Sequence, residues 1–303
     1  MTEIKDLIII GAGPAGITAA VYAARKKMDF CLITGDIGGQ AAWSAEIENY
    51  TGYQFITGPD LVAKFREHIE KYKFALKEGV EAKKVERSEN GFSASTSTGE
   101  TFYSRSIIIA TGKKPKLLNV PGEKEFKNRG VTYCATCDGP IFAGKEVAVI
   151  GGGNSALDAA LQMIKIASKV YVINNTEALS GDQIMQEKLA SAKNAEVINK
   201  ARVIEIKGEK FVNEIRVEVE GRSSTIPVQG VFIETGSMPN SDLIDLVKKN
   251  PFGEIMINCS SHTSCPGVFA AGDVTDVPEK QIIVAAGEGA KAALSAFRYI
   301  STH

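Results

Sequence analysis

The sequence predicts an α/β protein of two three-layer (ββα) domains, one inserted in the other. Its 303 residues suffice for about two domains. One pattern occurs near the start of the chain and again in its middle: a short apolar run, a glycine-rich turn and an amphipathic helical stretch. The segment 267–303 has strand, turn and helix signals of its own, so the first domain can resume there.

The first copy of the pattern covers residues 6–33 and has the order strand, turn, helix, strand, which opens a Rossmann-like dinucleotide-binding fold. In its turn, Gly11 permits a tight bend and Gly13 lets a pyrophosphate approach the helix N-terminus. Gly16 lets the helix pack on its strand. We expect a dinucleotide to bind here, on Gly11, Gly13, Pro14, Ala15 and Gly16.

The second copy covers residues 146–173, with Ala156 where the third glycine would stand, which is a tolerated variant. A nucleotide could bind this turn as well. A duplicated fold can also keep the turn and lose the ligand, so a purely structural turn stays open. The residues expected to bind a second nucleotide are Gly151, Gly153, Asn154 and Ser155.

Two polar, proline-bearing stretches, 113–116 and 236–240, are the predicted linkers between the domains. They assign residues 1–114 and 241–303 to the first domain and 115–240 to the inserted one. Within the first domain, 91–99 is predicted as a hairpin region and 106–110 as a buried strand.

The Rossmann pattern places an acidic ribose contact about 20 residues after the first glycine. The corresponding positions here, Thr34 and Asn174, are not acidic. The segment 174–180, Asn-Asn-Thr-Glu-Ala-Leu-Ser, also contains no Arg or Lys, so the 2′-phosphate of NADPH would lack a counter-charge. NADPH is therefore disfavoured, whereas Asn174 could donate a hydrogen bond to the ribose of NADH.

The segment Cys134-Ala-Thr-Cys137 is the predicted chemical centre. Two thiols on one helical turn can close a small disulfide ring and exchange with another disulfide. Zinc would need four ligands, and no second C-x-x-C exists, so we expect no metal. Asp138 could carry the proton that thiol exchange requires, or it could only form a local hydrogen bond.

The remaining cysteines carry weaker signals. Cys31 lies in an apolar strand and is expected to be a buried small hydrophobe. Cys259 and Cys265 could form a second redox pair, which is the less favoured interpretation.

Composition excludes several partners. The net charge is −1, so nothing favours nucleic acid or an anionic membrane. The N-terminus, MTEIKDLIII, has mixed charges and an apolar run too short for a signal peptide or a membrane span. We expect a cytoplasmic protein that binds neither.

Together these motifs resemble the low-molecular-weight thioredoxin reductases over essentially the whole chain. The resemblance implies FAD on the first glycine turn and on five further segments. Of these, the Gly-Asp pair would contact the ribityl–phosphate part and the later glutamine would approach the isoalloxazine. The implied FAD-binding residues outside the turn are Gly38, Gly39, Gln40, Asn49, Ala110, Thr111, Gly112, Gly272, Asp273 and Gln281.

The resemblance also implies the roles of the thiols and a homodimer. Cys137 would face the flavin, Cys134 would attack the partner's disulfide, and Asp138 would act as acid and base. The segment 174–180 departs from the basic NADPH signature of the family. The stretches 151–155 and 280–291 are closer to the flavoprotein subunit of alkyl hydroperoxide reductase, which prefers NADH. That flavoprotein carries an extra N-terminal thioredoxin-like portion, so we expect this chain's carrier to be a separate protein.

We therefore expect a disulfide reductase in which electrons pass from NADH through FAD and Cys134–Cys137 to a thioredoxin- or glutaredoxin-like protein. A reductase fed by ferredoxin, with an idle second turn, is one alternative. A non-catalytic, flavin-binding redox sensor is another, and steady turnover with a thioredoxin would exclude it.

Overall fold

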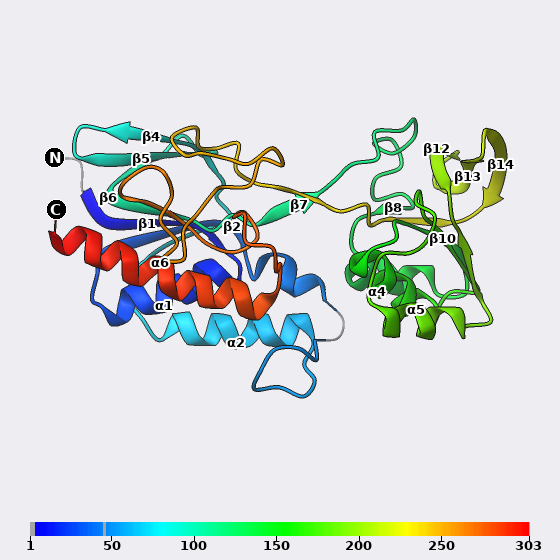
Figure 1. The fold of residues 1–303 in the computed structure, drawn as a ribbon, viewed down its shortest axis with the longest axis horizontal. Helices are drawn as coiled ribbons and strands as arrows, with labels where there is room; N and C mark the ends of the chain where they lie inside the picture. The colour runs from blue at the N-terminus through cyan, green and yellow to red at the C-terminus, as the bar shows by residue number, and fades with distance from the viewer. Residues whose placement is uncertain (1–3, 45–46, 303) are drawn as a thin grey trace. The chain divides into compact units, whose positions relative to one another are not determined.

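The chain folds into two compact units in the computed structural model, which describes residues 4–44 and 47–302, with Trp43 and Cys137 described for their backbone alone. The first unit comprises Met1–Lys114 and Met238–His303, and the second comprises Pro115–Ser237 (Figure 1). Both chain crossings are short strands, β7 (Lys113–Pro115) and β16 (Ser237–Pro239), which pair with each other. The second crossing thus lies within the predicted linker 236–240, three residues before the boundary expected at 240/241.

The first unit is built on a seven-stranded sheet of order β3-β2-β1-β6-β5-β4, with β17 also paired to β6. The pairs around β1 are parallel, whereas β4, β5 and β6 pair antiparallel. The strands are β1 (Ile4–Ala12), β2 (Phe30–Ile37), β3 (Ala75–Glu78), β4 (Ala82–Ser88), β5 (Gly91–Thr96), β6 (Thr101–Ile109) and β17 (Val268–Ala270). The expected hairpin region 91–99 is thus strand β5 and the turn that leads to β6.

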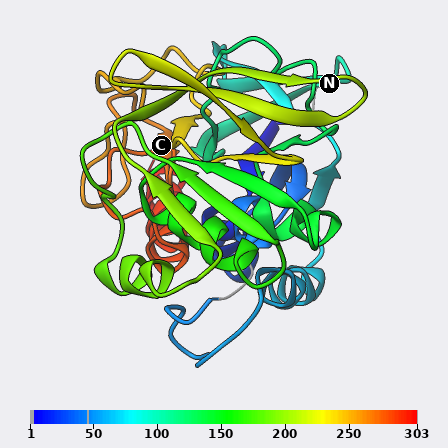
Figure 2. The same cartoon turned by 90° about the vertical axis from the view of Figure 1, so that its right-hand side faces the viewer.

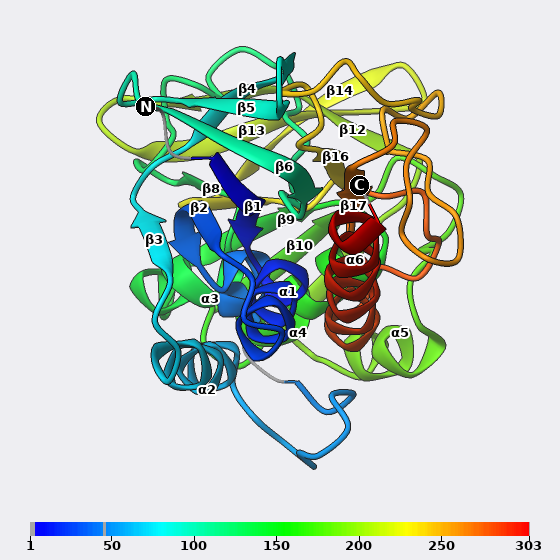
Figure 3. The same ribbon diagram turned by 90° about the vertical axis from the view of Figure 1, so that its left-hand side faces the viewer.

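Alternating residues of β1 divide the first unit into layers. Leu7 and Ile9 pack in one apolar core with α1 (Pro14–Arg25) and α6 (Ile282–Thr302). Ile8 and Ile10 pack in the opposite core with β4, β5 and the segment 243–274. Helices α1, α2 (Gly58–Glu70) and α6 lie together on one side of the sheet (Figure 3). The buried, nearly continuous apolar run of β1 is typical of a parallel strand covered on both faces.

The second unit repeats this plan (Figure 2). A parallel five-stranded sheet of order β11-β10-β9-β15-β8 packs against helices α4 and α5 on one face and a three-stranded antiparallel sheet on the other. The parallel strands are β8 (Val131–Thr132), β9 (Glu146–Ile150), β10 (Lys169–Ile173), β11 (Ala195–Ile198) and β15 (Gly230–Ile233). The antiparallel strands are β12 (Ala201–Gly208), β13 (Val212–Val219) and β14 (Arg222–Pro227). The helices are α3 (Ala135–Asp138), α4 (Asn154–Met163) and α5 (Gln183–Ala190).

Both glycine turns join a central parallel strand to the helix that follows it, as their sequence pattern predicts. In the first unit the turn leads from β1 into α1, and in the second from β9 into α4. The predicted second strand, 30–33, continues to Ile37, which moves its C-terminal end past Thr34. Within the described residues, no helix is long and apolar enough to cross a bilayer.

Candidate functional site

The first glycine turn forms an open cradle at the start of α1. A Cβ on Gly11, whose φ is +99°, would lie 2.3 Å from the Ala110 carbonyl oxygen, and one on Gly16 would lie 1.8 Å from that of Gly11. Gly13, in contrast, is the N-cap of α1, and a Cβ there meets no described atom within 4 Å. No side chain in the described part of the chain caps this helix end. Its backbone N–H groups and positive dipole end suit the pyrophosphate of FAD.

The Gly38-Gly39-Gln40 segment lies beside this cradle. The Gly38 amide donates to the Ala12 carbonyl at 2.7 Å, and a Cβ on Gly39 would lie 3.4 Å from the Gly13 Cα. The Gln40 Nε2 donates to the Lys113 carbonyl at 2.7 Å. The structure therefore brings the second predicted cofactor segment to the first, and connects it to strand β7.

The end of β2 carries an acidic residue that counting along the sequence missed. The Thr34 hydroxyl accepts from the Ala12 amide at 3.1 Å and donates to the Asp36 carbonyl, so it supports the turn. The exposed Asp36 carboxylate accepts from the Gly39 amide at 3.2 Å. Because β2 extends to Ile37, the acidic Asp36 lies in this strand end, two residues after Thr34, the position that counting along the sequence gave.

Two predicted cofactor residues from opposite ends of the chain meet directly. The Asn49 Nδ2 donates to the Gln281 Oε1 at 3.0 Å, and both side chains are exposed. Gln281 immediately precedes α6, whose residues pack against α1. The loop 47–56 is thereby joined to the start of the C-terminal helix.

The Gly272-Asp273 pair is held at the same helix. The Gly272 amide, in a left-handed turn with φ +78°, donates to the buried Glu288 carboxylate at 2.8 Å. A Cβ on Gly272 would lie 3.0 Å from that of Ala15, in the first turn of α1. Burial raises the pKa of Asp273, and the charges of Lys280 and Lys113 oppose that rise. Sequence reasoning missed Glu288, although it lies in the stretch 280–291.

Thr111, in the Ala110-Thr111-Gly112 segment, exchanges hydrogen bonds with Asn240. The Thr111 hydroxyl donates to the Asn240 carbonyl at 2.6 Å, and the Asn240 Nδ2 donates to the Thr111 carbonyl at 3.0 Å. These bonds fasten the returning chain to the end of β6. All the residues that the resemblance implies for FAD thus belong to the first unit.

Glu254 joins the strand β7 to the region just before α6. Its carboxylate forms salt bridges with Lys113 at 2.9 Å and with Lys280 at 3.1 Å. Burial raises the pKa of Glu254, but hydrogen bonds from Asn250, Lys113 and Lys280 outweigh it and lower the pKa to about 2. The carboxylate is therefore ionised throughout the physiological range.

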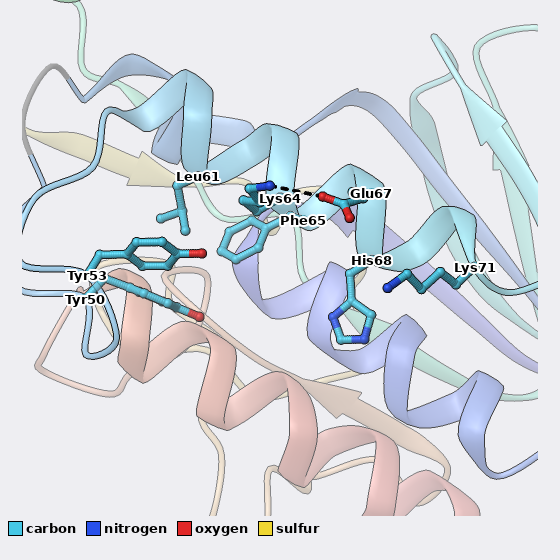
Figure 4. Close-up of a pocket in the computed structure, with 8 residues that line it drawn as sticks. All are labelled: Tyr50, Tyr53, Leu61, Lys64, Phe65, Glu67, His68 and Lys71. Atoms are coloured by element: carbon cyan, nitrogen blue, oxygen red, sulfur yellow. Dashed lines mark hydrogen bonds and ion pairs between the residues drawn. The ribbon is translucent and has the colours of Figure 1, made fainter.

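A pocket lined by aromatic and charged side chains lies beside the predicted cofactor residues without including them. The aromatic rings of Tyr50 and Phe65 pack obliquely, with their centroids 6.0 Å apart (Figure 4). The Lys64 ammonium lies 3.2 Å from the Glu67 carboxylate. Burial, followed by the neighbouring Tyr53, raises the pKa of Tyr50. The lining residues are Tyr50, Tyr53, Leu61, Lys64, Phe65, Glu67, His68 and Lys71.

In the second unit, Cys134 is disulfide-bonded and stands immediately before the single turn α3. The side chain of Cys137, its predicted partner, lies outside the described residues. The Thr132 hydroxyl accepts from the Cys134 amide at 3.2 Å and donates to the Asp138 carboxylate. Thr132, which sequence reasoning missed, thereby fixes Asp138 next to the cysteine segment. A carboxylate held there suits proton transfer to and from a thiol.

Tyr133 anchors the same segment on its other side. Its hydroxyl donates to Glu123 at 2.8 Å, and the Glu123 carboxylate also accepts from the amides of Leu118 and Asn119. Burial, then the hydrogen bond to Glu123, raises the pKa of Tyr133 well above its usual range. The residues that lead into α3 are therefore firmly bonded to the second unit.

The second glycine turn resembles the first, but residues 180–182 form hydrogen bonds to it. Gly153 is the N-cap of α4, and no side chain among the described residues caps this helix end. The amides of Ser180 and Gly181 both donate to the Gly152 carbonyl, at 2.8 and 3.1 Å. The exposed Asn154 accepts from the Asp182 amide at 2.6 Å, and Ser155 is exposed beside it.

Asn174, the predicted ribose contact, is buried and fully engaged. Its Nδ2 donates to Asn199 at 2.8 Å and to the Thr176 carbonyl at 3.3 Å, and its Oδ1 accepts from the Thr176 hydroxyl at 3.0 Å. A ribose contact would require an exchange of these bonds. Nearby, Lys200 forms a salt bridge with Glu177 at 3.1 Å, so that cation has a counter-charge already.

Two carboxylates are neighbours at the second turn. Glu234 directly follows β15, and a Cβ on Gly151 would lie 2.2 Å from its carbonyl oxygen. Burial raises the pKa of Glu234 to about 8, and the charge of Asp158 on α4 adds to the rise. Neither residue was singled out by the sequence patterns.

Three other cysteines carry free thiols. Cys31 is buried, as expected, and burial raises the pKa of its thiol to about 11. Cys259 is exposed, whereas Cys265 is buried and accepts from the Arg87 Nη2 at 3.3 Å. Cys259 and Cys265 are therefore not joined as the second redox pair that was considered.

Comparison with known proteins agrees with this architecture. The family of pyridine nucleotide-disulphide oxidoreductases matches residues 5–289. The F subunit of alkyl hydroperoxide reductase from Escherichia coli (strain K12) is 42% identical over 97% of this chain and 58% of its own length. An NADH dehydrogenase of Bacillus subtilis (strain 168) is 40% identical, with 97% of this chain and 58% of its own length covered. The chain thus spans somewhat more than half the length of these relatives.

A solved structure extends the likeness to both units. The thioredoxin reductase of Lactococcus lactis, in its FR conformation, matches with a TM-score of 0.94 and 35% identity over 99% of this chain and 100% of its own. The predicted fold class and the predicted resemblance, including that to the alkyl hydroperoxide reductase flavoprotein, are confirmed. The chain belongs to the pyridine nucleotide-disulphide oxidoreductases, an FAD-dependent class, and has the two-domain fold of the thioredoxin reductases.

Proposed function

We propose that this protein is a disulfide reductase that passes electrons from NADH, through FAD and the Cys134–Cys137 pair, to a thioredoxin- or glutaredoxin-like protein. The observation that carries the proposal is the disulfide-bonded Cys134 beside an Asp138 carboxylate that Thr132 holds in place. A carboxylate held beside the cysteine pair can accept and return the proton that is transferred during thiol–disulfide exchange.

The residues of the first unit fit FAD. The open Gly13 cradle would hold the pyrophosphate, and the Gly38–Gln40 segment would lie along it. Asp36 would accept from a ribose hydroxyl, and the Asn49–Gln281 pair would lie on the flavin side of the site. A bound FAD supplies the transfer of electrons between the donor and the disulfide.

In the dithiol step, the protein's own residues move the protons. Cys134 would attack the disulfide of the partner, and Cys137 would then displace the partner thiolate and restore the Cys134–Cys137 disulfide. Asp138 would accept and return the proton of the cysteine pair, while its bond from Thr132 keeps the carboxylate in place.

Several features favour NADH over NADPH as the electron donor. The segment 174–180 offers no cation to a 2′-phosphate, and Lys200 is already paired with Glu177. A relative named for NADH, the NADH dehydrogenase of Bacillus subtilis, supports this choice. The homodimer implied by the resemblance is part of the same proposal.

The half-reactions can be tested separately. Purified yellow protein would be mixed without oxygen with NADH, NADPH or reduced ferredoxin, and flavin bleaching followed. We expect fast bleaching by NADH at low concentration. Fast bleaching by NADPH or ferredoxin alone would overturn the choice of donor. The Cys137→Ser variant should keep FAD and NADH oxidation by artificial dyes but lose protein disulfide reduction.

A further inference from the structure

The threonine between the two cysteines is bonded to the helix that begins at the second glycine turn. The Thr136 hydroxyl donates to the Gln162 Oε1 at 3.0 Å, and the Gln162 Nε2 donates to the Asp158 Oδ2 at 2.8 Å. Gln162 and Asp158 are four residues apart on α4 and therefore share one face of that helix. All three side chains are half-buried, so the chain of bonds is partly shielded from water.

The carboxylate at the end of this chain sets its direction. The Asp158 carboxylate oxygen accepts from the Gln162 Nε2, so the NH₂ end of the Gln162 amide lies toward Asp158. The amide oxygen then faces Thr136, whose hydroxyl must donate. Asp158 thus orients Gln162, and Gln162 in turn holds the side chain of Thr136, between the two cysteines.

Packing brings the next residues of the segment to the same helix. A Cβ on Gly139 would lie 3.3 Å from the Met163 sulfur on α4 and 3.7 Å from the Ile166 side chain. The turn α3 has four residues, too few to be stable alone. Its shape is therefore maintained by its attachments: Thr132 before it, Thr136 within it and Gly139 after it.

We propose that Gln162, oriented by Asp158, is a positioning residue for the Cys134–Cys137 pair, holding the turn close to its disulfide geometry when the bond is open. The proposal rests on the proposed redox role of the two cysteines. Opening the disulfide frees the turn, and the Thr136–Gln162 bond limits that freedom. The thiols then meet more often, which favours the disulfide and lowers the reduction potential of the pair.

The test is a redox titration of the purified holoenzyme against glutathione buffers. The state of Cys134 and Cys137 would be read by trapping free thiols with an alkylating reagent and mapping the peptides by mass spectrometry. This readout needs no electron donor, protein partner or turnover. Gln162→Leu and Thr136→Val should each lower the equilibrium constant for disulfide formation about 3- to 10-fold, the range for one lost hydrogen bond. A tenfold change corresponds to about 30 mV in the potential of this two-electron couple.

Three comparisons separate positioning from a general structural effect. The double variant should shift the constant no more than either single one, because both remove the same bond. Thr136→Ser keeps the hydroxyl and should retain the wild-type constant. Gln183→Leu on α5 removes a matched amide–carboxylate bond, that of Gln183 to Glu187 at 3.0 Å, and should leave the constant unchanged.

Unchanged constants in Gln162→Leu and Thr136→Val, or shifts that simply add in the double variant, would overturn the proposal. These results differ from a failure of the proposed function. If the wild-type cysteines did not titrate as an exchanging pair at all, the function itself and this inference would both be wrong.

Discussion

Asn49 donates a hydrogen bond of 3.0 Å to Gln281, a residue 232 positions further along the chain. The bond connects the loop 47–56 of the first unit with the beginning of α6. Both residues were predicted to bind FAD from separate segments, and the fold brings them side by side at the exposed end of that helix.

The Asn49–Gln281 contact predicts a role in retaining the cofactor. Asn49→Leu and Gln281→Leu should each weaken FAD binding about 5- to 10-fold, since each removes a hydrogen-bonding group worth about 1 kcal/mol. Equilibrium dialysis or quenching of flavin fluorescence measures the affinity. Asn213→Leu, at an exposed position of the second unit, serves as the control and should keep wild-type affinity. Equal FAD affinity in all three variants would contradict the assignment.

Glu234 predicts a pH dependence of stability. Its pKa in the folded chain is about 8, above the ordinary value of 4.5, so between these values the folded chain holds a proton that the unfolded chain releases. The free energy of unfolding should therefore fall as pH rises from about 4.5 to 8 and then level off. The fall is at most about 1.4 kcal/mol for each unit by which folding raises this pKa. Glu234→Gln should remove this fall.

Thermal melting of the second unit from pH 5 to 9 measures the effect of Glu234. The Gln variant should match the wild type near pH 5 and melt higher at pH 8 and above. The exposed Glu209→Gln, in the same unit, is the control and should follow the wild-type curve. A Glu234→Gln curve that runs parallel to the wild type at every pH would show that this carboxyl does not titrate as inferred.

Two substitutions at the edge of the second glycine turn should change which nucleotide donates electrons. Asn175→Arg combined with Glu177→Ala adds one cation and frees Lys200 from its salt bridge. Two positive charges could then face a 2′-phosphate, so kcat/KM with NADPH should rise about 10- to 100-fold. Stopped-flow reduction of the flavin by each nucleotide measures this. The rate with NADH should change little, and no gain with NADPH would place the nucleotide elsewhere.

An exposed apolar side chain next to the cysteine segment predicts a contact with the protein partner. Ile141, in the 3-10 helix Gly139–Phe142, is 66% exposed. Burying it against a partner should contribute about 1–2 kcal/mol, so Ile141→Ser should raise KM for a thioredoxin about 5- to 20-fold. Ile184 on α5, 64% exposed, offers a matched control as Ile184→Ser. Reduction of a small synthetic disulfide should be unaffected in both.

Local patterns predicted the two glycine turns because strand, turn and helix are adjacent in the sequence, and the cysteine pair because its two thiols share one turn. The partners of these motifs come from elsewhere in the chain. Thr132 and Gln162 bond to the cysteine segment from β8 and α4, and Glu288 reaches Gly272 from α6. Sequence spacing carries no signal for such contacts.

Two residues near strand ends, Asp36 and Asn174, show what counting along the sequence leaves out. Asp36 was missed because β2 continues to Ile37, beyond the apolar run on which its end was judged. Asn174 was predicted as a ribose contact from its position alone, yet its amide completes buried bonds to Thr176 and Asn199. Burial of a polar group requires partners, and which groups are buried follows from the packed fold.

The most direct test of the account is NADH-driven reduction of a thioredoxin disulfide by the wild type and by Cys134→Ser. Free thiols on the thioredoxin would be counted as NADH is consumed. The account predicts two thiols for each NADH with the wild type and none with the variant, although the variant still oxidises NADH with an artificial acceptor. Thioredoxin reduction at the wild-type rate by Cys134→Ser would contradict it.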